Sequence, residues 1–367
     1  MNSVIEKEQF LTLQELVVEA RSKLADNAWA YIVGGAETET SLRRNRLALD
    51  SLALRPRVLN DVSEIDTAAE LFGSPSRLPV FLCPVGGLES FNPDGAMAVA
   101  KGATAFGVPM MLSSVSEWSA SDLVANHIDP RSLIVQLYAR EDAAGVDQWV
   151  ERSNELSLPA FCITVDSAIY GRRERDIVAR YVKPWRAKSE GRSAHFQALL
   201  SWKDIERIRS KFKNQLVLKG ISTREDAQLA IEHGVDMIYV SNHGGRQLDH
   251  SVGSASALVE VVDAVNGQAK VLVDGGFCRG TDIAKAIALG ADGVGLGRLM
   301  CFALAAAGAV GVERMLELLE EEYRVALGLI GVRSGAQLNQ SHIQNVEAIQ
   351  HDTALLSAFP LLNEIVL

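Results

Sequence analysis

Short apolar runs alternate along the chain with segments in which apolar residues recur every three or four positions. The eight runs cover residues 80–85, 108–113, 133–138, 160–166, 216–219, 237–242, 271–274 and 293–297. Segments of helical spacing lie between most of them, at 94–105, 143–155, 224–233 and 280–289. Nearly continuous apolar strands that alternate with helices are typical of a parallel sheet covered by helices. The structural alternative is an open doubly wound sheet. Because eight such units close a barrel, and no early G-x-G-x-x-G is present, the pattern favours an α/β fold of the (β/α)8 TIM-barrel class.

Before this rhythm begins, residues 1–75 have a different pattern. Helical spacing covers 12–24, where Thr12 and Glu15 have the arrangement of a capping box. Two further helical pieces follow at 27–33 and 38–49. We therefore expect an N-terminal helical extension, 1–75, that covers one end of a barrel formed by residues 76–367.

One interval, 167–212, is far longer than an ordinary connection between a strand and a helix. It follows the fourth strand, so it is expected to form a lid over the carboxyl end of the barrel, where the active sites of such barrels lie. A helix is expected to resume near residue 201. At the other end of the chain, 312–327 has the pattern of an amphipathic helix that closes the barrel.

Composition narrows the function classes. The formal net charge is −10, which argues against non-specific nucleic-acid binding. The four cysteines show no C-x-x-C spacing, so we expect free thiols, no metal site and a cytoplasmic location. No secretory pattern is evident at the start of the chain. The weakly polar run 299–312 is too short to span a bilayer and is expected to be a buried helix.

Polar residues stand at the ends of most of the predicted strands. Because the carboxyl ends of barrel strands converge on one mouth, these side chains are expected to lie together. Any one of them could be an ordinary capping or buried polar group, but their joint occurrence favours a functional site. The residues in question are Gln136, Tyr138, Thr164, Asp166, Lys219, Ser241, His243, Asp274, Gly276, Gly297 and Arg298.

The turn at 241–247, Ser-Asn-His-Gly-Gly-Arg-Gln, holds a histidine and an arginine three positions apart. Histidine can exchange a proton near neutral pH, and arginine offers a fork of donors to a carboxylate or phosphate. Taken alone, the turn could equally be a polar loop after a strand.

Two glycine-rich segments follow the last two strands. Asp274-Gly275-Gly276 leads to Arg279 and a helix start, and Gly293-x-Gly295-x-Gly297 ends at Arg298. Backbone N–H groups at this place in a barrel often bind phosphate. A dinucleotide fingerprint is the weaker alternative, because the spacing and the place in the chain are wrong for it.

Together these motifs resemble those of the FMN-dependent 2-hydroxy acid oxidase and dehydrogenase family, which includes glycolate oxidase, lactate oxidase and mandelate dehydrogenase. They occur in the family's order over nearly the whole chain. The matching stretches are 31–37, 136–138, 164–166, 171–176, 218–220, 241–247 and 274–276.

The resemblance implies FMN as cofactor and a role for each matching residue. His243 would be the general base, and Asp166 would stabilise its protonated form. Tyr31 and Arg246 would hold the substrate carboxylate, while Arg173 and Tyr138 would contact the carboxylate or the 2-hydroxyl. Lys219 would stabilise the reduced flavin. The remaining FMN contacts would come from Pro84, Val85, Gly86, Ser113, Gln136, Thr164, Ser241, Asp274, Gly276, Arg279, Gly297 and Arg298.

The chain departs from the family pattern at three places. Cys278 stands where many relatives have the first of two adjacent arginines, Val115 replaces an aromatic residue, and Gly86 is similar to mandelate dehydrogenase rather than to most oxidases. The lid also lacks the apolar insert of membrane-bound relatives. These differences suggest a 2-hydroxy acid bulkier than glycolate or lactate, either aryl or branched.

The resulting hypothesis is oxidation of an L-2-hydroxy acid to the 2-oxo acid, with electrons passing to FMN and then to oxygen or another acceptor. By resemblance we expect a homotetramer that does not insert into a membrane. The alternatives are another enzyme on an FMN barrel, such as a type 2 isopentenyl diphosphate isomerase, and a flavin-binding protein without catalytic activity. The isomerase would not need the full set of Tyr31, Tyr138, Arg173, His243 and Arg246. The presence of His243, Asp166 and Lys219 together argues against a protein without catalytic activity.

Overall fold

Eight parallel strands form a closed barrel in a computed structural model that describes residues 9–184 and 195–365 of the chain. In chain order the strands are β4 (Val80–Leu82), β5 (Met110–Ser113), β6 (Leu133–Leu137), β7 (Ala160–Thr164), β8 (Gln215–Ile221), β9 (Met237–Val240), β10 (Lys270–Val273) and β11 (Gly293–Leu296). Each strand pairs with its neighbour in the sequence, and β11 closes the ring by pairing with β4. The predicted TIM barrel is confirmed, and the strands coincide with the eight apolar runs to within a few residues.

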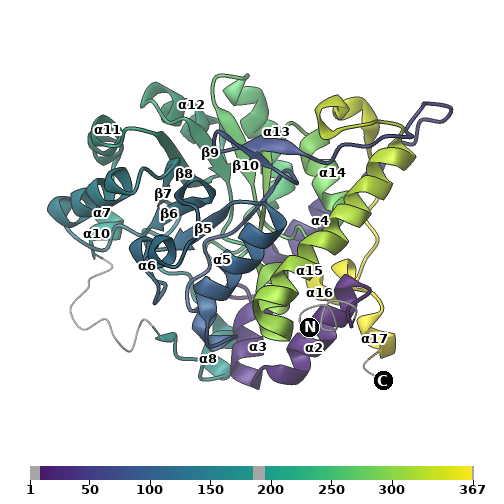
Figure 1. Cartoon of the computed structure of the whole chain (residues 1–367), viewed down its shortest axis with the longest axis horizontal. Helices are drawn as coiled ribbons and strands as arrows, with labels where there is room; N and C mark the ends of the chain where they lie inside the picture. Colours follow the sequence, from purple (N-terminus) through teal and green to yellow (C-terminus); the bar gives the residue numbers. More distant parts are fainter. Residues whose placement is uncertain (1–8, 185–194, 366–367) are drawn as a thin grey trace.

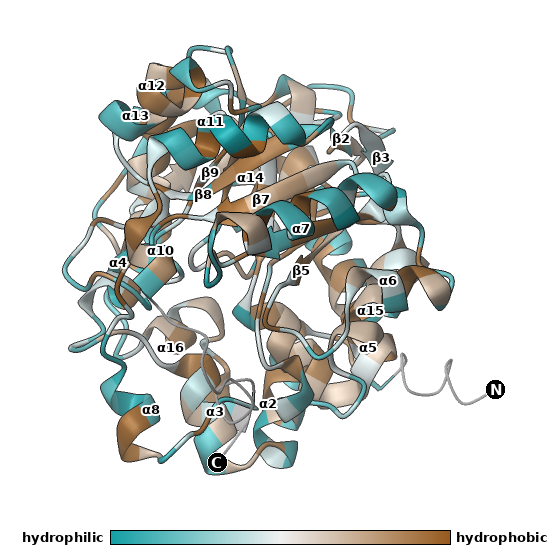
Figure 2. Cartoon of the chain, turned by 90° about the vertical axis from the view of Figure 1, so that its left-hand side faces the viewer, coloured by the Kyte–Doolittle hydropathy of each residue, from teal (hydrophilic) through white to brown (hydrophobic). Residues whose placement is uncertain are grey.

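Helices surround the barrel and bury their apolar sides against it (Figure 1). They are α5 (Gly95–Phe106), α6 (Ala120–Ala125), α7 (Ala143–Glu155), α11 (Trp202–Lys211), α12 (Arg224–Glu232), α13 (Ser254–Val265), α14 (Gly280–Ala288) and α15 (Arg298–Ile330). In Figure 2 the strands β7, β8 and β9 are hydrophobic, whereas α7 and α11 turn hydrophilic residues outward. This division explains why the strands appear in the sequence as unbroken apolar runs and the helices as periodic ones.

The N-terminal extension covers both ends of the barrel, not one as predicted from the sequence. Its hairpin of β2 (Ala69–Leu71) and β3 (Ser74–Ser76) closes the end where the strands begin. There Phe72 packs edge-on against Phe81, with 5.7 Å between ring centroids, and Leu71 fills the space beside Gly293. Both side chains thereby join the apolar cluster inside the barrel.

At the opposite end, helices α3 (Asp26–Val33) and α4 (Thr40–Asp50) of the extension lie against loops that follow the strands, whereas α2 (Leu13–Lys23) packs against α15. The buried Asn45 exchanges hydrogen bonds with Asn242, at 3.0 and 2.8 Å, and Arg46 donates one to the Gly276 carbonyl at 2.7 Å. The extension therefore positions two of the loops that carry predicted site residues.

The interval predicted to be a lid contains several short elements. They include α8 (Glu174–Val178), α10 (His195–Leu199) and α11; residues 185–194 lie outside the described part of the chain. Helix α11 buries Ile205 and Ile208 and belongs to the outer ring of the barrel. Among the described residues of the interval, those over the barrel mouth are thus confined to the part before α11.

Helix α15 is the only helix in the described ranges that is long and apolar enough to cross a membrane. Most of it is buried, and the backbone is non-helical at Ala307 and Gly308, where two helical pieces join at a kink. It packs against α5 and α2 (Figure 1). The predicted buried helix at 299–312 and amphipathic helix at 312–327 are therefore parts of one kinked core helix.

The remaining elements are short strands, helices and 3-10 turns. Strand β1 (Leu52–Leu54) pairs antiparallel with β12 (Ile343–Asn345). Short helices follow at α16 (Ala354–Ala358) and α17 (Leu362–Ile365), and single 3-10 turns occur at η1 (Leu88–Ser90), η2 (Pro130–Ser132), η3 (Gly335–Gln337) and η4 (Gln340–His342). Helix α16 packs against α4, so the C-terminal segment supports the same end of the barrel as the extension.

Candidate active site

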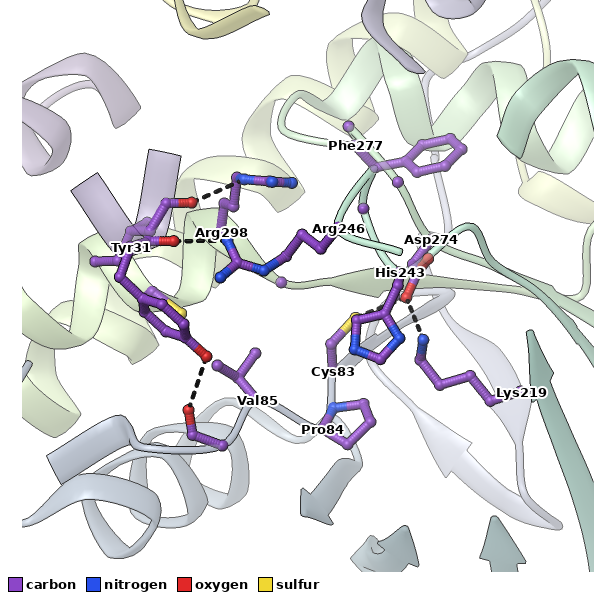
Figure 3. A pocket seen from close by; sticks show the side chains of 18 of the residues that line it. Tyr31, Cys83, Pro84, Val85, Lys219, His243, Arg246, Asp274, Phe277 and Arg298 are labelled. Carbon is purple, nitrogen blue, oxygen red and sulfur yellow. Dashed lines mark hydrogen bonds and ion pairs between the residues drawn. The ribbon is translucent and has the colours of Figure 1, made fainter. Parts of the chain in front are cut away.

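A cavity of about 980 Å³, including its open mouth, lies at the carboxyl ends of the barrel strands. Cofactors and substrates bind at this end of such barrels. Figure 3 shows Tyr31, His243, Lys219, Asp274, Arg246 and Arg298 around it. The predicted residues that line it are Tyr31, Pro84, Val85, Gly86, Tyr138, Arg173, Lys219, His243, Arg246, Asp274, Gly276, Gly297 and Arg298.

His243 occupies the turn after β9 with a left-handed backbone, φ 59°. The backbone N–H of His243 donates a hydrogen bond to the Ser241 hydroxyl at 3.0 Å, which fixes the turn. The ring nitrogen Nδ1 lies 3.0 and 3.2 Å from the two carboxylate oxygens of Asp166, and Nε2 lies 3.1 Å from the Tyr138 hydroxyl. When Nδ1 donates to Asp166, Nε2 faces the cavity as a proton acceptor.

The environment of His243 favours its neutral form. Burial is the largest influence and lowers the pKa of His243 from its ordinary value of 6.5, and Asp166 only partly offsets this effect. Asp166 lies where it can stabilise a protonated His243, but it raises the pKa of His243 by less than burial lowers it. For Asp166 itself, burial alone would raise the pKa, yet His243 and Lys219 hold it below its ordinary value. A neutral imidazole beside a carboxylate is the arrangement a general base requires.

Two buried arginines stand on the side of the cavity near the lid. Arg246 lies over the ring of Tyr31, 4.4 Å from its centroid, and donates to the backbone carbonyls of Tyr31 and Gly34 at 2.6 and 3.0 Å. Its Nη2 atom is buried without a hydrogen-bond partner and lies 3.7 Å from Oδ2 of Asp176, too far for a hydrogen bond. Arg173 donates to the Arg246 carbonyl at 3.1 Å.

These two guanidinium groups affect each other. Burial, and then the charge of Arg173, lower the pKa of Arg246. A carboxylate bound between them would relieve the repulsion and supply a partner to the unsatisfied Nη2 atom.

Lys219, at the end of β8, forms a charge pair inside the barrel mouth. Its Nζ donates to the Ser241 hydroxyl at 2.7 Å and lies 3.5 Å from Oδ2 of Asp274. Burial alone would lower the pKa of Lys219, but Asp274 and Asp166 raise it, so the ammonium stays charged. Lys219 therefore places a fixed positive charge at the wall of the cavity (Figure 3).

Three predicted cofactor contacts lie behind the cavity lining. Gln136 and Thr164 are fully buried on neighbouring strands, and Gln136 Nε2 donates to the Thr164 hydroxyl at 2.8 Å. The Oε1 atom of Gln136 has no partner. Ser113 is buried one strand away and lies near Gly86. A buried amide oxygen without a donor indicates that a ligand N–H belongs there.

The phosphate end of the predicted site is built differently from the expectation. Cys278 and Arg298 line the cavity, and Gly276 adopts φ 90°, which brings its backbone close to the ligand space. Arg298 donates to the carbonyls of Ile32 and Gly34 at 2.9 and 2.8 Å. Burial, together with Arg246, lowers the pKa of Arg298 to about 10.

Arg279, which the sequence predicts at the phosphate, does not line the cavity. Its guanidinium pairs with Glu322 of α15 at 2.5 Å and donates to the Ala358 carbonyl at 3.2 Å. A carboxylate on a neighbouring helix thus takes the arginine. Of the two arginines expected at this end, only Arg298 lines the cavity.

The residues present fit FMN. The unsatisfied Gln136 Oε1 would accept from an N–H of the flavin edge, and Gly276 and Gly297 line the cavity, where backbone N–H groups could bind a phosphate. Lys219 and Arg298 supply positive charge toward the anionic parts of the group.

Several residues of the site were not found from the sequence. Tyr170 and Cys83 line the cavity, and Lys183 of the lid donates to the Tyr170 hydroxyl at 3.1 Å. Tyr181 stacks on Tyr31 with 4.4 Å between ring centroids and thereby fixes the lid over the mouth. No sequence signal marks them, because aromatic residues in a long loop are compatible with many arrangements.

Comparisons with known proteins agree with this geometry. The family described as FMN-dependent dehydrogenase matches residues 20–345. Glycolate oxidase 5 of Oryza sativa subsp. japonica is 38% identical over 344 residues, which are 88% of this chain and 93% of that protein. A peroxisomal (S)-2-hydroxyacid oxidase of Arabidopsis thaliana is 36% identical over 361 residues, covering 94% of this chain and 97% of the relative.

Solved structures of mandelate oxidase are also similar. The complex with (S)-2-phenylpropionate and the complex with benzoyl-formic acid each have a TM-score of 0.84 and 37% identity. The similarity covers 93% of this chain and 100% of each of those chains.

Proposed function

The chain belongs to the family of FMN-dependent dehydrogenases, and from this premise we propose that it oxidises an L-2-hydroxy acid to the 2-oxo acid with His243 as general base. The relatives named glycolate oxidase, (S)-2-hydroxyacid oxidase and mandelate oxidase support the reaction class. The observation that carries the proposal is the contact of His243 with both Asp166 and Tyr138 in a cavity that three arginines also line.

Substrate binding would begin with the carboxylate. Arg246 and Arg173 offer two guanidinium groups, and the Nη2 atom of Arg246, which has no hydrogen-bond partner, can donate to a carboxylate oxygen. Tyr31 and Tyr138 bring hydroxyl groups to the same cavity. Binding from two directions fixes the substrate's orientation, which lowers the entropic part of the barrier.

The proton step would belong to His243. Its Nε2 atom accepts the proton of the substrate while Nδ1–H remains bonded to Asp166. The resulting imidazolium gains from the adjacent carboxylate, whose own pKa is held low. Tyr138, within 3.1 Å of the same nitrogen, would orient the 2-hydroxyl.

When bound, FMN supplies the two-electron acceptor of the oxidation. Gln136, Thr164, Ser113 and Ser241 would hold its ring, while Pro84, Val85 and Gly86 would pack beside it. Gly276, Gly297 and Arg298 would hold the phosphate. Lys219 would stabilise negative charge that develops on the ring during reaction.

We propose a substrate with a bulky aryl or branched side chain. Val115, Phe91 and Val85 give that part of the cavity an apolar lining, and the likeness to mandelate oxidase, including its complex with (S)-2-phenylpropionate, agrees with a phenyl group. Val115 fills the space beside Gly86, because its Cγ2 atom lies 2.4 Å from the position that a Cβ on Gly86 would have. The smaller side chain at position 115 therefore widens the cavity less than the sequence alone suggests. Gly86 and Val115 therefore shape this wall as a pair.

Oxygen is the proposed electron acceptor, since the relatives compared above are named oxidases. We also propose a homotetramer and a cytoplasmic location. The buried free thiols Cys83, Cys162, Cys278 and Cys301 agree with a reducing compartment, although three relatives are named peroxisomal.

The decisive experiment is anaerobic mixing of the FMN-loaded protein with a panel of 2-hydroxy acids, followed by oxygen. We expect bleaching that is faster with S-mandelate or a branched 2-hydroxy acid than with glycolate or lactate, and rapid return of colour with oxygen. Faster bleaching by glycolate would overturn the proposed substrate size. A flavin that none of the acids reduces would favour a binding protein or an isomerase instead.

A further inference from the structure

A buried polar cluster reaches from the cavity wall into the interior of the barrel. Tyr239 of β9 donates to Oδ2 of Asp274 at 2.8 Å, and the Ser241 hydroxyl donates to Oδ1 at 2.6 Å. The Cys83 thiol lies 3.2 Å from the Tyr239 hydroxyl and 3.8 Å from Oδ2. Lys219 completes the cluster, 3.5 Å from the same Oδ2 atom (Figure 3).

Tyr239 stands out from the apolar interior around it. Its side chain is fully buried, and its ring packs edge-on against Phe81 with 5.2 Å between centroids. A Cβ on Gly295 would lie 2.6 Å from the Tyr239 hydroxyl and 2.7 Å from the Cys83 sulfur. Strand β11 therefore leaves room for the hydroxyl and the thiol at a position where any larger residue would displace them.

The polar groups of this cluster converge on one carboxylate. Tyr239 and Ser241 each donate to it, and the Cys83 thiol is within reach. Lys219 contacts the same Asp274 oxygen, Oδ2, as Tyr239 does, but at a longer distance. A carboxylate whose lone pairs accept strong hydrogen bonds from neutral donors attracts a nearby ammonium less than a bare one does.

We propose that Tyr239 is a positioning residue that acts through Asp274 on Lys219 and thereby raises the reduction potential of the bound FMN. The inference rests on the proposed place of Lys219 beside the cofactor. With the Tyr239 hydrogen bond in place, the negative charge of Asp274 is partly balanced by the tyrosine, and the charge of Lys219 remains available to the cavity. Without it, Oδ2 would draw Lys219 inward and oppose negative charge on the reduced flavin.

The test is the midpoint potential of the FMN-loaded Tyr239→Phe variant, measured by equilibration with a reference dye. We expect the equilibrium constant for flavin reduction to fall about tenfold, which corresponds to about 30 mV for a two-electron couple. The matched control is Tyr323→Phe. Tyr323 is also fully buried, but its hydroxyl has no partner and it does not line the cavity, so its removal should leave the potential unchanged.

A second variant keeps the test decisive if Tyr239→Phe does not fold. Cys83→Ala removes the weaker donor and should lower the potential in the same direction by a smaller amount. A potential equal to that of the wild-type protein in the folded Tyr239 variant, or in Cys83→Ala where the former does not fold, would overturn the inference.

The potential is measured without any 2-hydroxy acid, so the result is separate from the proposed reaction. A potential that falls as expected in a protein reduced by no 2-hydroxy acid would support the inference while removing the proposed function. A protein that binds no FMN would overturn both.

Discussion

At the residue scale, the chemistry depends on how His243 is kept neutral and aimed. Burial lowers its pKa, Asp166 orders its Nδ1 side, and Tyr138 meets its Nε2 side. Because the neutral imidazole is the reactive form, kcat/KM for a 2-hydroxy acid should fall as pH drops through a pKa below 6.5.

Replacement of Asp166 tests this arrangement. In Asp166→Asn the carboxylate that raises the pKa of His243 is gone, so the acidic limb of kcat/KM should move to still lower pH. The rate on the plateau should fall by about 10²- to 10⁴-fold, because the imidazolium loses its stabilising partner. A pH profile of anaerobic flavin reduction measures both effects, and an acidic limb that moves to higher pH would contradict the electrostatic account.

Most of the residues in the cavity could be predicted from the sequence, for a definite physical reason. His243 and Asp274 follow recognisable barrel strands and Lys219 lies near the end of one, and barrel geometry brings such positions together. Arg279 could not be placed, because the direction of a side chain after a glycine turn depends on Glu322, a partner from a distant helix. Tyr239 was read as part of an apolar strand, since its hydroxyl finds Asp274 only in the folded barrel.

At the element scale, the start of α14 shows how a loop that faces the cofactor is held. Asp282 is buried and accepts from Arg46 at 2.7 Å and from the backbone N–H groups of Cys278 and Arg279 at 2.9 and 3.1 Å. One carboxylate thus ties the phosphate-end loop to helix α4 of the extension.

Loss of this carboxylate should be costly. Asp282→Ala leaves the Arg46 guanidinium buried with only Asp50 as an ion-pair partner among the described residues, at 3.0 Å. We expect the free energy of unfolding to fall by about 3 kcal/mol and FMN to bind more weakly. Urea unfolding and FMN titration measure the two effects. Glu174→Ala, which breaks the exposed pair with Arg172, is the control and should change neither. Equal stability of the two variants would show that Asp282 does not hold the loop.

The end of the lid is set by one element, helix α11. The length of 167–212 marked it as unusual, but the boundary between lid and barrel helix was not evident from length alone. The Ser201 and Asp204 capping box starts α11, and its apolar face at Ile205 and Ile208 returns the chain to the barrel. Local signals therefore located the helix start, while the contact of Tyr181 with Tyr31 needed the folded structure.

At the scale of the whole molecule, the N-terminal extension joins both ends of the barrel. The hairpin with Phe72 closes one end, and Asn45 joins α4 to the turn of His243 at the other. The sequence indicated a helical extension but not its path, because its partners are loops more than a hundred residues away.

The link at Asn45 gives a prediction for the whole molecule. In Asn45→Ala the amide of Asn242 and the N–H of Ser254 both lose a buried partner. We expect a loss of about 3 kcal/mol in the free energy of unfolding, and slower flavin reduction because Asn242 precedes His243. Thermal unfolding and anaerobic reduction rates test it against Asn60→Ala, whose amide bonds the Gly331 carbonyl in an exposed place. Wild-type reduction rates in Asn45→Ala would mean that the extension does not position the turn.

The most direct test of the account compares anaerobic flavin reduction in the wild-type protein and in His243→Gln, each loaded with FMN and mixed with the acid that reduces the wild type fastest. We predict that the variant keeps its flavin, is still bleached by dithionite, and is reduced by the acid at least about 10²-fold more slowly. Reduction of His243→Gln at the wild-type rate would contradict the assignment of His243 as the base.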